Sequence, residues 1–350
     1  MHINEHIYVV HINLPIINHF RFPNTILTGH LIYPHIEIQN GQICQSIFTW
    51  FRQKRKQQQQ QAITKIHKQP AELNSELDKW ELVDNGFTHF VTEEELEYEF
   101  KVICQPGNGT TFGLSQETIS TKKVLPGPNG CPFMERHKKY TRSTVSSNQI
   151  RVVSYNILAD IYADSEYSQK NLYPYCKKQF LSFDYRKLLI IKEIIGYKCD
   201  LLFLQEVDKI FMEKGIGPIL ENLGYGSNFL CKDQMVEGLA IFYNRSKFNC
   251  LQNQNHTFSN LLFKDEMFEF LKSKVMDNVF LMDRISKLKN SFQILLLNSI
   301  EQEKKLLLVC NLHLYSKDDA DHIRLIQSYI CFKYMETMIE TIKINVNINI

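Results

Sequence analysis

Three polar residues stand where apolar stretches of the sequence end. Asn156 follows RVVSY, Glu206 follows LLFLQ and His313 follows LLLVCNL. A rigid strand aims the side chain at its end while the loops around it leave room for a substrate, so all three positions could do chemistry. Each residue alone is more often structural, as a turn former, a solvated carboxylate or a hydrogen-bonded core histidine. When the three residues are considered together, a functional interpretation is about as strong as a structural one.

The three residue types suit the cleavage of a phosphate ester with the help of magnesium. A carboxylate with an amide nearby supplies hard oxygen ligands, and Mg²⁺ needs few protein ligands because it keeps several waters. A histidine beside such a metal can donate to a phosphoryl oxygen, or to the leaving oxygen as charge builds there. The residues alone lead to the hypothesis of a Mg²⁺-assisted phosphodiesterase.

The elements that must position these residues alternate between strands and helices after residue 150. Apolar stretches predict buried strands at 151–160, 199–208, 237–244, 292–300 and 305–316. Helical spacing and end signals predict helices at 183–198, 217–226, 257–290 and 320–342. Because the strands are apolar throughout, we expect an α/β domain whose sheet is covered on both faces.

The first 145 residues show a different pattern, with short alternating stretches and frequent turn signals. The stretches 30–38, 42–51 and 80–113 predict strands, and LPGPNG at 125–130 predicts a turn. Helical periodicity is scarce, which indicates a small β-rich domain, a sandwich in its simplest form. The run RQKRKQQQQQ at 52–61 is expected to be a solvated loop; an RNA-contacting loop is the alternative.

Length and composition limit the classes of protein that the chain can be. Its 350 residues suffice for about two domains at roughly 100–200 residues each. The formal net charge of +2 lacks the basic excess of proteins that coat nucleic acids. Nine cysteines without a C-x-x-C pair fit neither a zinc ribbon nor a disulfide framework, and favour a reducing compartment. No apolar run approaches the roughly 18–20 residues that span a bilayer.

Short motifs follow one another in a recognisable order through the second half. They are SYNILAD (154–160), LYPYC (172–176), DYR (184–186), LQEVD (204–208), EGLAIFY (237–243), NLHLY (311–315) and IRLIQ (323–327). This set resembles the endonuclease/exonuclease/phosphatase superfamily, and within it the eukaryotic 2′,5′-phosphodiesterases that degrade 2-5A (2′,5′-linked oligoadenylate) and trim poly(A) tails. LYPYC with DYR is specific to this group, whereas SYNILA and LQEV are shared with deadenylases of the carbon catabolite repressor, nocturnin and angel types.

The first half resembles the same family. TGHLIYPHIEI, SIFTWFR, FKVICQPGNGTTFG and residues 134–141 are similar to the β-rich domain that precedes the catalytic domain in the 2′,5′-phosphodiesterases and that the deadenylase relatives lack. The expected fold class is therefore α+β. It comprises a β-rich, sandwich-like N-terminal domain at 1–148, a partial endonuclease/exonuclease/phosphatase α/β sandwich at 149–340, and a tail at 341–350 that matches no segment of the family.

The resemblance also implies roles for individual residues. Glu206 matches the principal Mg²⁺ ligand, and Asn156 matches the amide that helps to place metal and phosphate. His313 matches a histidine near the scissile phosphate that stabilises the transition state. Glu237 matches a position at the rim of the substrate pocket, and Arg324 is expected to be structural or near the substrate.

The activity implied is in-line attack of a metal-activated water on a phosphodiester. The expected cofactor is Mg²⁺, and the expected partners are 2′,5′-linked oligoadenylate and single-stranded, adenylate-rich RNA, with neither DNA nor a membrane. Product leaves as a 5′-nucleotide. The expected location is intracellular, either the mitochondrial matrix, as in the animal family, or the cytoplasm.

Motifs that the family carries later in its catalytic domain are not found in this sequence. It contains neither a Gly-Asp dipeptide for a G-D-x-N motif nor an S-D-H motif, and its last acidic residue is Glu340. We expect a truncated product or an incomplete gene model of the enzyme. Two alternatives stay open: a non-catalytic RNA-binding protein or pseudoenzyme, and a deadenylase that acts on 3′–5′ bonds only.

Overall fold

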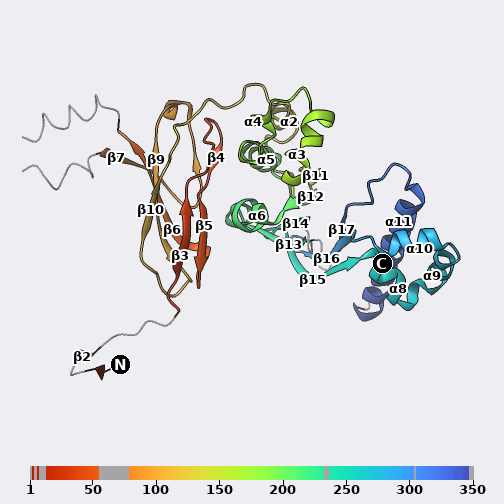
Figure 1. The fold of residues 1–350 in the computed structure, drawn as a ribbon. Coiled ribbons are helices and arrows are strands. Elements are labelled where there is room, and N and C mark those ends of the chain that lie inside the picture. The colour runs from red at the N-terminus through yellow and green to blue at the C-terminus, as the bar shows by residue number, and fades with distance from the viewer. Residues whose placement is uncertain are drawn as a thin grey trace, which may run out of the picture. The chain divides into compact units, whose positions relative to one another are not determined.

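The computed structural model describes residues 2–3, 6–7, 13–54, 79–231, 236–302 and 305–346 (Figure 1). The chain forms two compact units, each assembled from separate stretches. The first takes the described residues of 1–142, 163–197 and 213–222, and the second those of 143–162, 198–212 and 223–350. The domain boundary expected near residue 148 remains a prediction, because this division assigns several separate stretches of the chain to each unit. Most of the 52–61 run, from residue 55 onward, lies outside the described residues, as do residues 347–350 of the expected tail.

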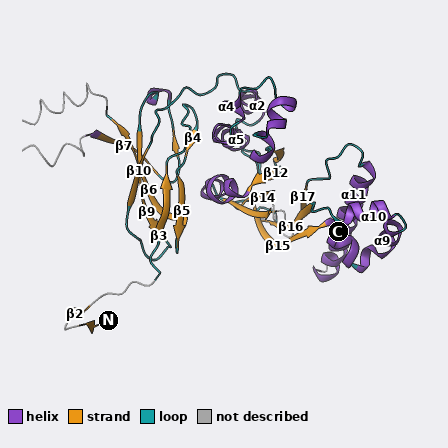
Figure 2. Ribbon diagram, in the orientation of Figure 1, coloured by secondary structure: helices purple, strands orange, loops and turns teal. Residues whose placement is uncertain are grey.

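Antiparallel strands dominate the first unit (Figure 2). They are β1 (His2–Ile3), β2 (His6–Ile7), β3 (Ile16–Arg21), β4 (Leu31–Ile32), β5 (His35–Gln39), β6 (Gln42–Gln53), β7 (Trp80–Asn85), β8 (His89–Phe90), β9 (Phe100–Gly107) and β10 (Gln116–Ile119). The largest sheet has the order β10-β9-β6-β7, while β1 pairs with β2, β3 with β5, and β4 with β8. The β-rich N-terminal part that the sequence predicts is confirmed.

Alternation along the strands explains how this part buries a core. On β9, Phe100, Val102 and Cys104 are buried and the residues between them are partly exposed, as expected of a sheet with one covered face. Trp50 on β6 is completely buried, and its indole Nε1 donates a 2.8 Å hydrogen bond to the carbonyl of Gly86. The aromatic side chain is thereby buried without losing its polar contact.

Helices complete the first unit. They are α2 (Pro132–Tyr140), α4 (Lys178–Leu181), α5 (Phe183–Tyr197) and α7 (Gly217–Asn222), while α3 (Asp160–Ala163) runs across the division at residue 162. Sequence analysis expected strands and turns up to about residue 145, and α2 is an exception. Pro132 occupies its first position, where the missing N–H costs nothing and the fixed φ favours a helix.

Helix α5 is joined to the N-terminal strands through a buried lysine. Lys187 is 2% exposed, and its Nζ lies 2.5 Å from Oδ1 of Asp184 and 3.0 Å from Nε2 of His35 on β5. The second carboxylate oxygen of Asp184 accepts a 2.8 Å hydrogen bond from Asn24. Asp184 is the first residue of the DYR motif, so this motif contributes to the contact between α5 and the β-rich part.

The second unit contains two sheets. Its strands are β11 (Val152–Asn156), β12 (Leu201–Asp208), β13 (Tyr225–Cys231), β14 (Glu237–Asn244), β15 (Phe248–Thr257), β16 (Ser291–Ser299) and β17 (Leu306–Leu312). One sheet has the order β11-β12-β14-β13, with β11 and β12 parallel and the other pairs antiparallel. The other sheet, β15-β16-β17, is antiparallel throughout. The mixture of helices and sheets confirms the expected α+β class.

Apolar side chains from the two sheets of this unit pack against each other. One cluster contains Phe203 of β12, Ile241 of β14, Leu295 of β16 and Val309 of β17, so the sheets form a sandwich. On the opposite face of the three-stranded sheet lie α8 (Phe258–Lys264), α9 (Glu269–Met276), α10 (Val279–Ser286) and α11 (Asp321–Val346). Because β16 contributes side chains to the apolar clusters on both of its faces, nearly all of its residues are buried.

Two strands of the second unit were not predicted. β13 and β15 have the sequences YGSNFLC and FNCLQNQNHT, whose polar residues break any continuous apolar run. Both lie at a sheet edge, where one side of the strand pairs with no neighbour. Helix α11 continues to Val346, past the predicted end at 342. Among the described residues, no helix combines the length and the apolar character that crossing a bilayer requires.

Candidate functional site

Glu206 lies near the end of β12, in a bulge of the sheet. The pairing of β12 with β14 shifts register between Leu204 and Val207, and Glu206 stands between them. Its backbone is left-handed, with a φ of 57°, a conformation that costs a non-glycine residue roughly 1–2 kcal/mol. Bulges and strained backbones recur beside functional sites, where they aim a side chain. The backbone therefore supports a functional role for Glu206.

Asn156 meets Glu206 because β11 and β12 run parallel and end at the same edge. It is the last residue of β11, and its Nδ2 donates a 2.7 Å hydrogen bond to Oε1 of Glu206. Its Oδ1 accepts a 3.0 Å bond from the backbone N–H of Leu158. The backbone N–H of Ala159 lies 3.3 Å from the other carboxylate oxygen of Glu206. The loop after β11 thus fixes the orientation of both side chains.

His313 reaches the same place from the other sheet of the second unit. It follows β17 directly, and its Nε2 lies 3.8 Å from Oε1 of Glu206. The His313 side chain is 28% exposed, against 12% for Glu206, so the imidazole is the more accessible of the two. The structure therefore brings Asn156, Glu206 and His313 together, although more than 150 residues separate the first from the last.

Behind these residues a buried amide joins the two sheets. Asn311 of β17 is 2% exposed, and its Oδ1 accepts a 2.8 Å hydrogen bond from Nε2 of Gln205. Its Nδ2 donates to the carbonyl oxygens of Leu204 and Ala240, at 2.9 and 3.1 Å. Because Gln205 precedes Glu206 and Asn311 stands two residues before His313, these bonds couple the strand ends that carry the site. The NLHLY motif carries no local signal that would give its Asn this role.

The resemblance places Glu237 at the rim of the substrate pocket, and this role stays a prediction. Glu237 begins β14 and is completely buried, and its Oε1 accepts a 3.3 Å hydrogen bond from the hydroxyl of Tyr162. Burial raises the pKa of Tyr162 to about 12, assisted by the carboxylates of Glu237 and, further away, Glu206. Tyr162 therefore keeps its proton beside the site. Tyr162 could not be predicted as part of the site, because an isolated tyrosine after SYNILAD carries no local signal.

Arg324 has a structural position, one of the two roles expected for it. Its guanidinium donates to the carbonyl oxygens of Tyr315 and Lys317, at 3.0 and 2.7 Å, and pairs with Asp321 in the first turn of α11. These contacts tie the segment after His313 to the start of the helix. The guanidinium of Arg324 thus contacts two backbone carbonyl groups and one carboxylate of the chain, as expected of a structural residue.

Glu206 and Asn156 are the residues that could hold a metal ion. No group of three or more His, Cys, Asp or Glu side chains in the described ranges is arranged around a common metal position. Mg²⁺ nevertheless binds through as few as one or two carboxylates and completes its shell with waters and substrate phosphates. One mostly buried carboxylate beside an amide fits such an ion.

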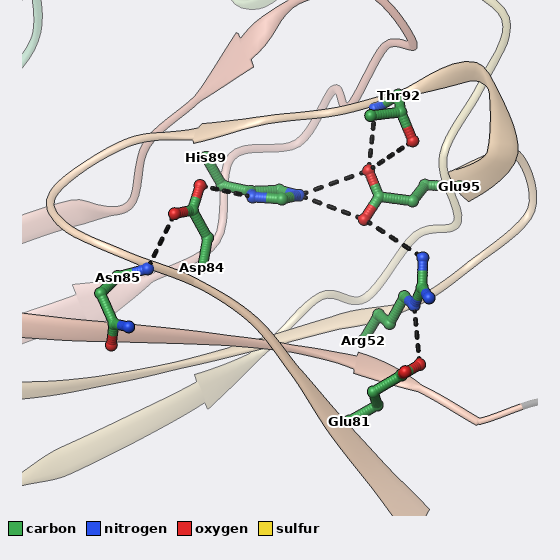
Figure 3. A network of polar contacts seen from close by, with 7 residues as sticks. All are labelled: Arg52, Glu81, Asp84, Asn85, His89, Thr92 and Glu95. Carbon is green, nitrogen blue, oxygen red and sulfur yellow. Dashed lines mark hydrogen bonds and ion pairs between the residues drawn. The ribbon is translucent and has the colours of Figure 1, made fainter.

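A second polar network surrounds His89 in the first unit (Figure 3). The ring Nδ1 lies 3.0 Å from Asp84, and Nε2 lies 3.3 Å from the buried carboxylate of Glu95. Glu95 also accepts a 2.8 Å bond from the backbone of Thr92 and lies 3.8 Å from the guanidinium of Arg52. Each charged group has an opposite charge beside it, as buried ions require. We assign this network to the stability of the β-rich part.

Comparisons with known proteins relate both halves of the chain to one group. Residues 14–125 match the family described as 2′,5′-phosphodiesterase 12-like, N-terminal domain. The 2′,5′-phosphodiesterase 12 of Rattus norvegicus is 34% identical over 323 residues, which cover 91% of this chain and 52% of the relative. The chain thus spans about half the length of the curated relatives that it matches over most of its own length.

Two further similarities are confined to part of the chain. The carbon catabolite repressor protein 4 homolog 2 of Arabidopsis thaliana is 29% identical over 192 residues, covering 49% of this chain and 31% of the relative. The crystal structure of ANGEL2, described as a 2′,3′-cyclic phosphatase, shares 27% identity at a TM-score of 0.41, covering 52% of this chain and 46% of that one.

Proposed function

The chain belongs to the 2′,5′-phosphodiesterase 12-like family, and on this premise we propose that it is a Mg²⁺-dependent phosphodiesterase. Its substrates are 2′,5′-linked oligoadenylate and the 3′–5′ poly(A) tails of single-stranded RNA. The observation that carries the proposal is the convergence of Glu206, Asn156 and His313 from the ends of three strands. A carboxylate, an amide and an imidazole that lie this close together can all contact one bound phosphate group, which suits phosphoryl chemistry.

Each residue has a separate task in this proposal. Glu206 holds the metal, and the N–H groups of Asn156 and Ala159 keep its carboxylate in one orientation. When bound, Mg²⁺ supplies positive charge at the phosphate and lowers the pKa of a coordinated water. His313 donates a hydrogen bond to a phosphoryl oxygen or to the leaving ribose oxygen. Tyr162, which keeps its proton, and the buried Glu237 form a wall beside this site through the hydrogen bond between them.

The substrate and the location are parts of the same proposal. A 2′,5′-linked substrate is favoured because the relatives that match most of the chain are named 2′,5′-phosphodiesterase, whereas the carbon catabolite repressor relative matches only half of it. The preference for adenylate-rich strands rests on the resemblance of the motifs. We propose the mitochondrial matrix or the cytoplasm as the location. Nine free cysteines without a disulfide suit such reducing compartments. Fractionation of cells that express a tagged chain distinguishes the two.

A linkage comparison tests the activity. The purified chain is incubated with Mg²⁺ and with matched adenylate trimers that carry either 2′–5′ or 3′–5′ bonds, and release of 5′-adenylate is followed by chromatography. Glu206→Gln keeps the side-chain volume and removes the charge, and we expect it to lower the rate by at least roughly 10²-fold. Glu269→Gln, at an exposed carboxylate of α9, is the matched control and should leave the rate unchanged.

Each outcome of this experiment assigns the chain to one class. Turnover of both trimers supports the proposal, and turnover of the 3′–5′ trimer alone supports a deadenylase instead. Equal rates for the wild type and Glu206→Gln would remove the metal role of Glu206. Binding of the trimers without product, measured by fluorescence anisotropy, would identify a non-catalytic RNA-binding protein.

A further inference from the structure

Two cysteines of the second unit lie in direct contact. The Sγ atoms of Cys310 on β17 and Cys331 on α11 are 3.4 Å apart. Cys331 is 3% exposed within the apolar cluster between α11 and the three-stranded sheet, and Cys310 is partly buried against the same cluster. All nine cysteines of the chain are free thiols in the structure. The contact is therefore between two reduced side chains that already face each other.

The two thiols differ chemically. A hydrogen bond between the sulfur atoms lowers the pKa of Cys331, and it raises the pKa of Cys310 together with burial. The thiolate is the reactive form of cysteine, and the lowered pKa favours Cys331 as the first thiol to react. Cys310 then stands in contact with it and is placed to resolve the product. A low-pKa cysteine next to a resolving cysteine is the arrangement of redox-sensitive pairs.

We propose that Cys310 and Cys331 form an oxidisable pair that closes to an intramolecular disulfide with hydrogen peroxide. In the first step the Cys331 thiolate attacks one peroxide oxygen, the O–O bond breaks, and hydroxide leaves, which gives a sulfenic acid on Cys331. In the second step the Cys310 sulfur attacks the Cys331 sulfur, and the S–O bond breaks. The sulfenic oxygen leaves as water with the Cys310 proton. Two thiols are oxidised and one peroxide is reduced to two waters.

The disulfide would tie α11 to the strand that leads into the candidate site. Cys310 stands directly before Asn311 on β17, and the loop closed between the two cysteines contains His313 and Arg324. Cross-linking removes conformational freedom from the unfolded chain. The oxidised protein should therefore unfold at a temperature roughly 3–5 °C higher, and dithiothreitol should reverse the shift.

Peptide mapping tests the proposal on the wild-type chain. The protein is treated with stoichiometric hydrogen peroxide, its free thiols are alkylated in denaturant, and it is digested with trypsin without reduction. Cleavage after Lys305, Lys317, Arg324 and Lys333 places the two cysteines on separate peptides, 306–317 and 325–333. We expect one species that joins both peptides, with a mass two hydrogens below the sum of the two peptide masses. The protein should run as a monomer on a non-reducing gel, which shows that the disulfide lies within one chain.

A pair of variants supplies the control. Cys310→Ser should abolish the joined peptide and leave Cys331 as a sulfenic acid that reacts with dimedone, while Cys250→Ser in the same sheet should leave the joined peptide unchanged. Recovery of both wild-type peptides in alkylated form after peroxide treatment would overturn the proposal. A cross-link of either cysteine to a different thiol would overturn it equally. Neither result depends on phosphodiesterase activity.

Discussion

Nε2 of Gln205 donates a 2.8 Å hydrogen bond to Oδ1 of Asn311, and this bond joins the two sheets of the second unit directly behind the candidate site. Gln205 is adjacent to Glu206 in the chain, and Asn311 is two residues from His313. The Asn311 amide also donates to two backbone carbonyl groups of the facing sheet. A side chain that satisfies three partners in a buried place is costly to replace, because each partner loses its hydrogen bond.

Replacing Asn311 by Leu should destabilise the protein strongly, although leucine and asparagine have similar sizes. The change leaves the Gln205 amide and two carbonyl groups without this partner, and we expect the free energy of unfolding to fall by about 2–4 kcal/mol. Urea denaturation followed by circular dichroism measures it. Asn249→Leu, at an exposed position of β15, should change the same quantity by less than about 0.5 kcal/mol. Equal effects of the two substitutions would contradict the role given to Asn311.

The left-handed backbone of Glu206 predicts an unusual order of stabilities among its variants. Glycine adopts a φ of 57° without the Cβ penalty, whereas alanine retains that penalty. After the greater chain entropy of unfolded glycine is subtracted, Glu206→Gly should be more stable than Glu206→Ala by about 0.5–1 kcal/mol. Thermal unfolding of the two variants side by side gives the difference. An alanine variant that is the more stable would show that the backbone relaxes on substitution.

The network around His89 predicts a loss of stability at alkaline pH. Burial alone lowers the pKa of His89, but hydrogen bonds to Glu95 and Asp84 outweigh it, so the pKa is raised. His89 therefore contributes fully below its unfolded value near 6.5, and the contribution disappears as the pH rises through the folded pKa. The difference in unfolding free energy between the wild type and His89→Gln should be larger at pH 5.5 than at pH 8.5, by about 1 kcal/mol. In a Glu95→Gln background this pH dependence should become smaller, because only the Asp84 carboxylate then remains to raise the pKa of His89.

His35 predicts the opposite dependence in the same unit. Burial and the neighbouring Lys187 lower its pKa to about 4, below the unfolded value near 6.5. The unfolded chain binds more protons between these two values, so stability falls as the pH is lowered from 6.5 toward 4. Allowing for partial exposure, we expect His35 to account for about 1–2 kcal/mol of that loss. His35→Gln keeps an acceptor for Lys187 and should flatten the acid limb of a urea-midpoint profile. If the urea midpoint of His35→Gln falls as steeply at acid pH as that of the wild type, the loss of stability at acid pH comes from carboxylates and not from His35.

Strand ends could be predicted from the sequence because apolar runs mark buried strands. Asn156 ends β11, Glu206 lies near the end of β12 and His313 follows β17, as the runs before them indicate. That the three side chains meet depends on pairing between distant strands, which no local pattern specifies. The parallel pairing of β11 with β12 places Asn156 beside Glu206.

Features that depend on tertiary packing could not be predicted. Glu237 is completely buried at the start of β14, the strand between β12 and β13, yet its sequence position suggests only the start of a strand. Tyr162 becomes part of the site only through its bond to Glu237. The edge strand β15 is polar enough to be read as a loop, and it is held by backbone pairing with β16.

The interleaving of the two units has a consequence for synthesis of the chain. The first unit includes residues 163–197 and 213–222, so its last segment leaves the ribosome about 80 residues after residue 142. At roughly 5–20 residues per second, the β-rich part waits some 4–16 s before this last segment, which contains α7, has been synthesised. During that interval the second unit has begun to emerge as well. Folding of the two units is therefore expected to overlap in time, and a ribosome pause after residue 142 should leave the first unit sensitive to protease.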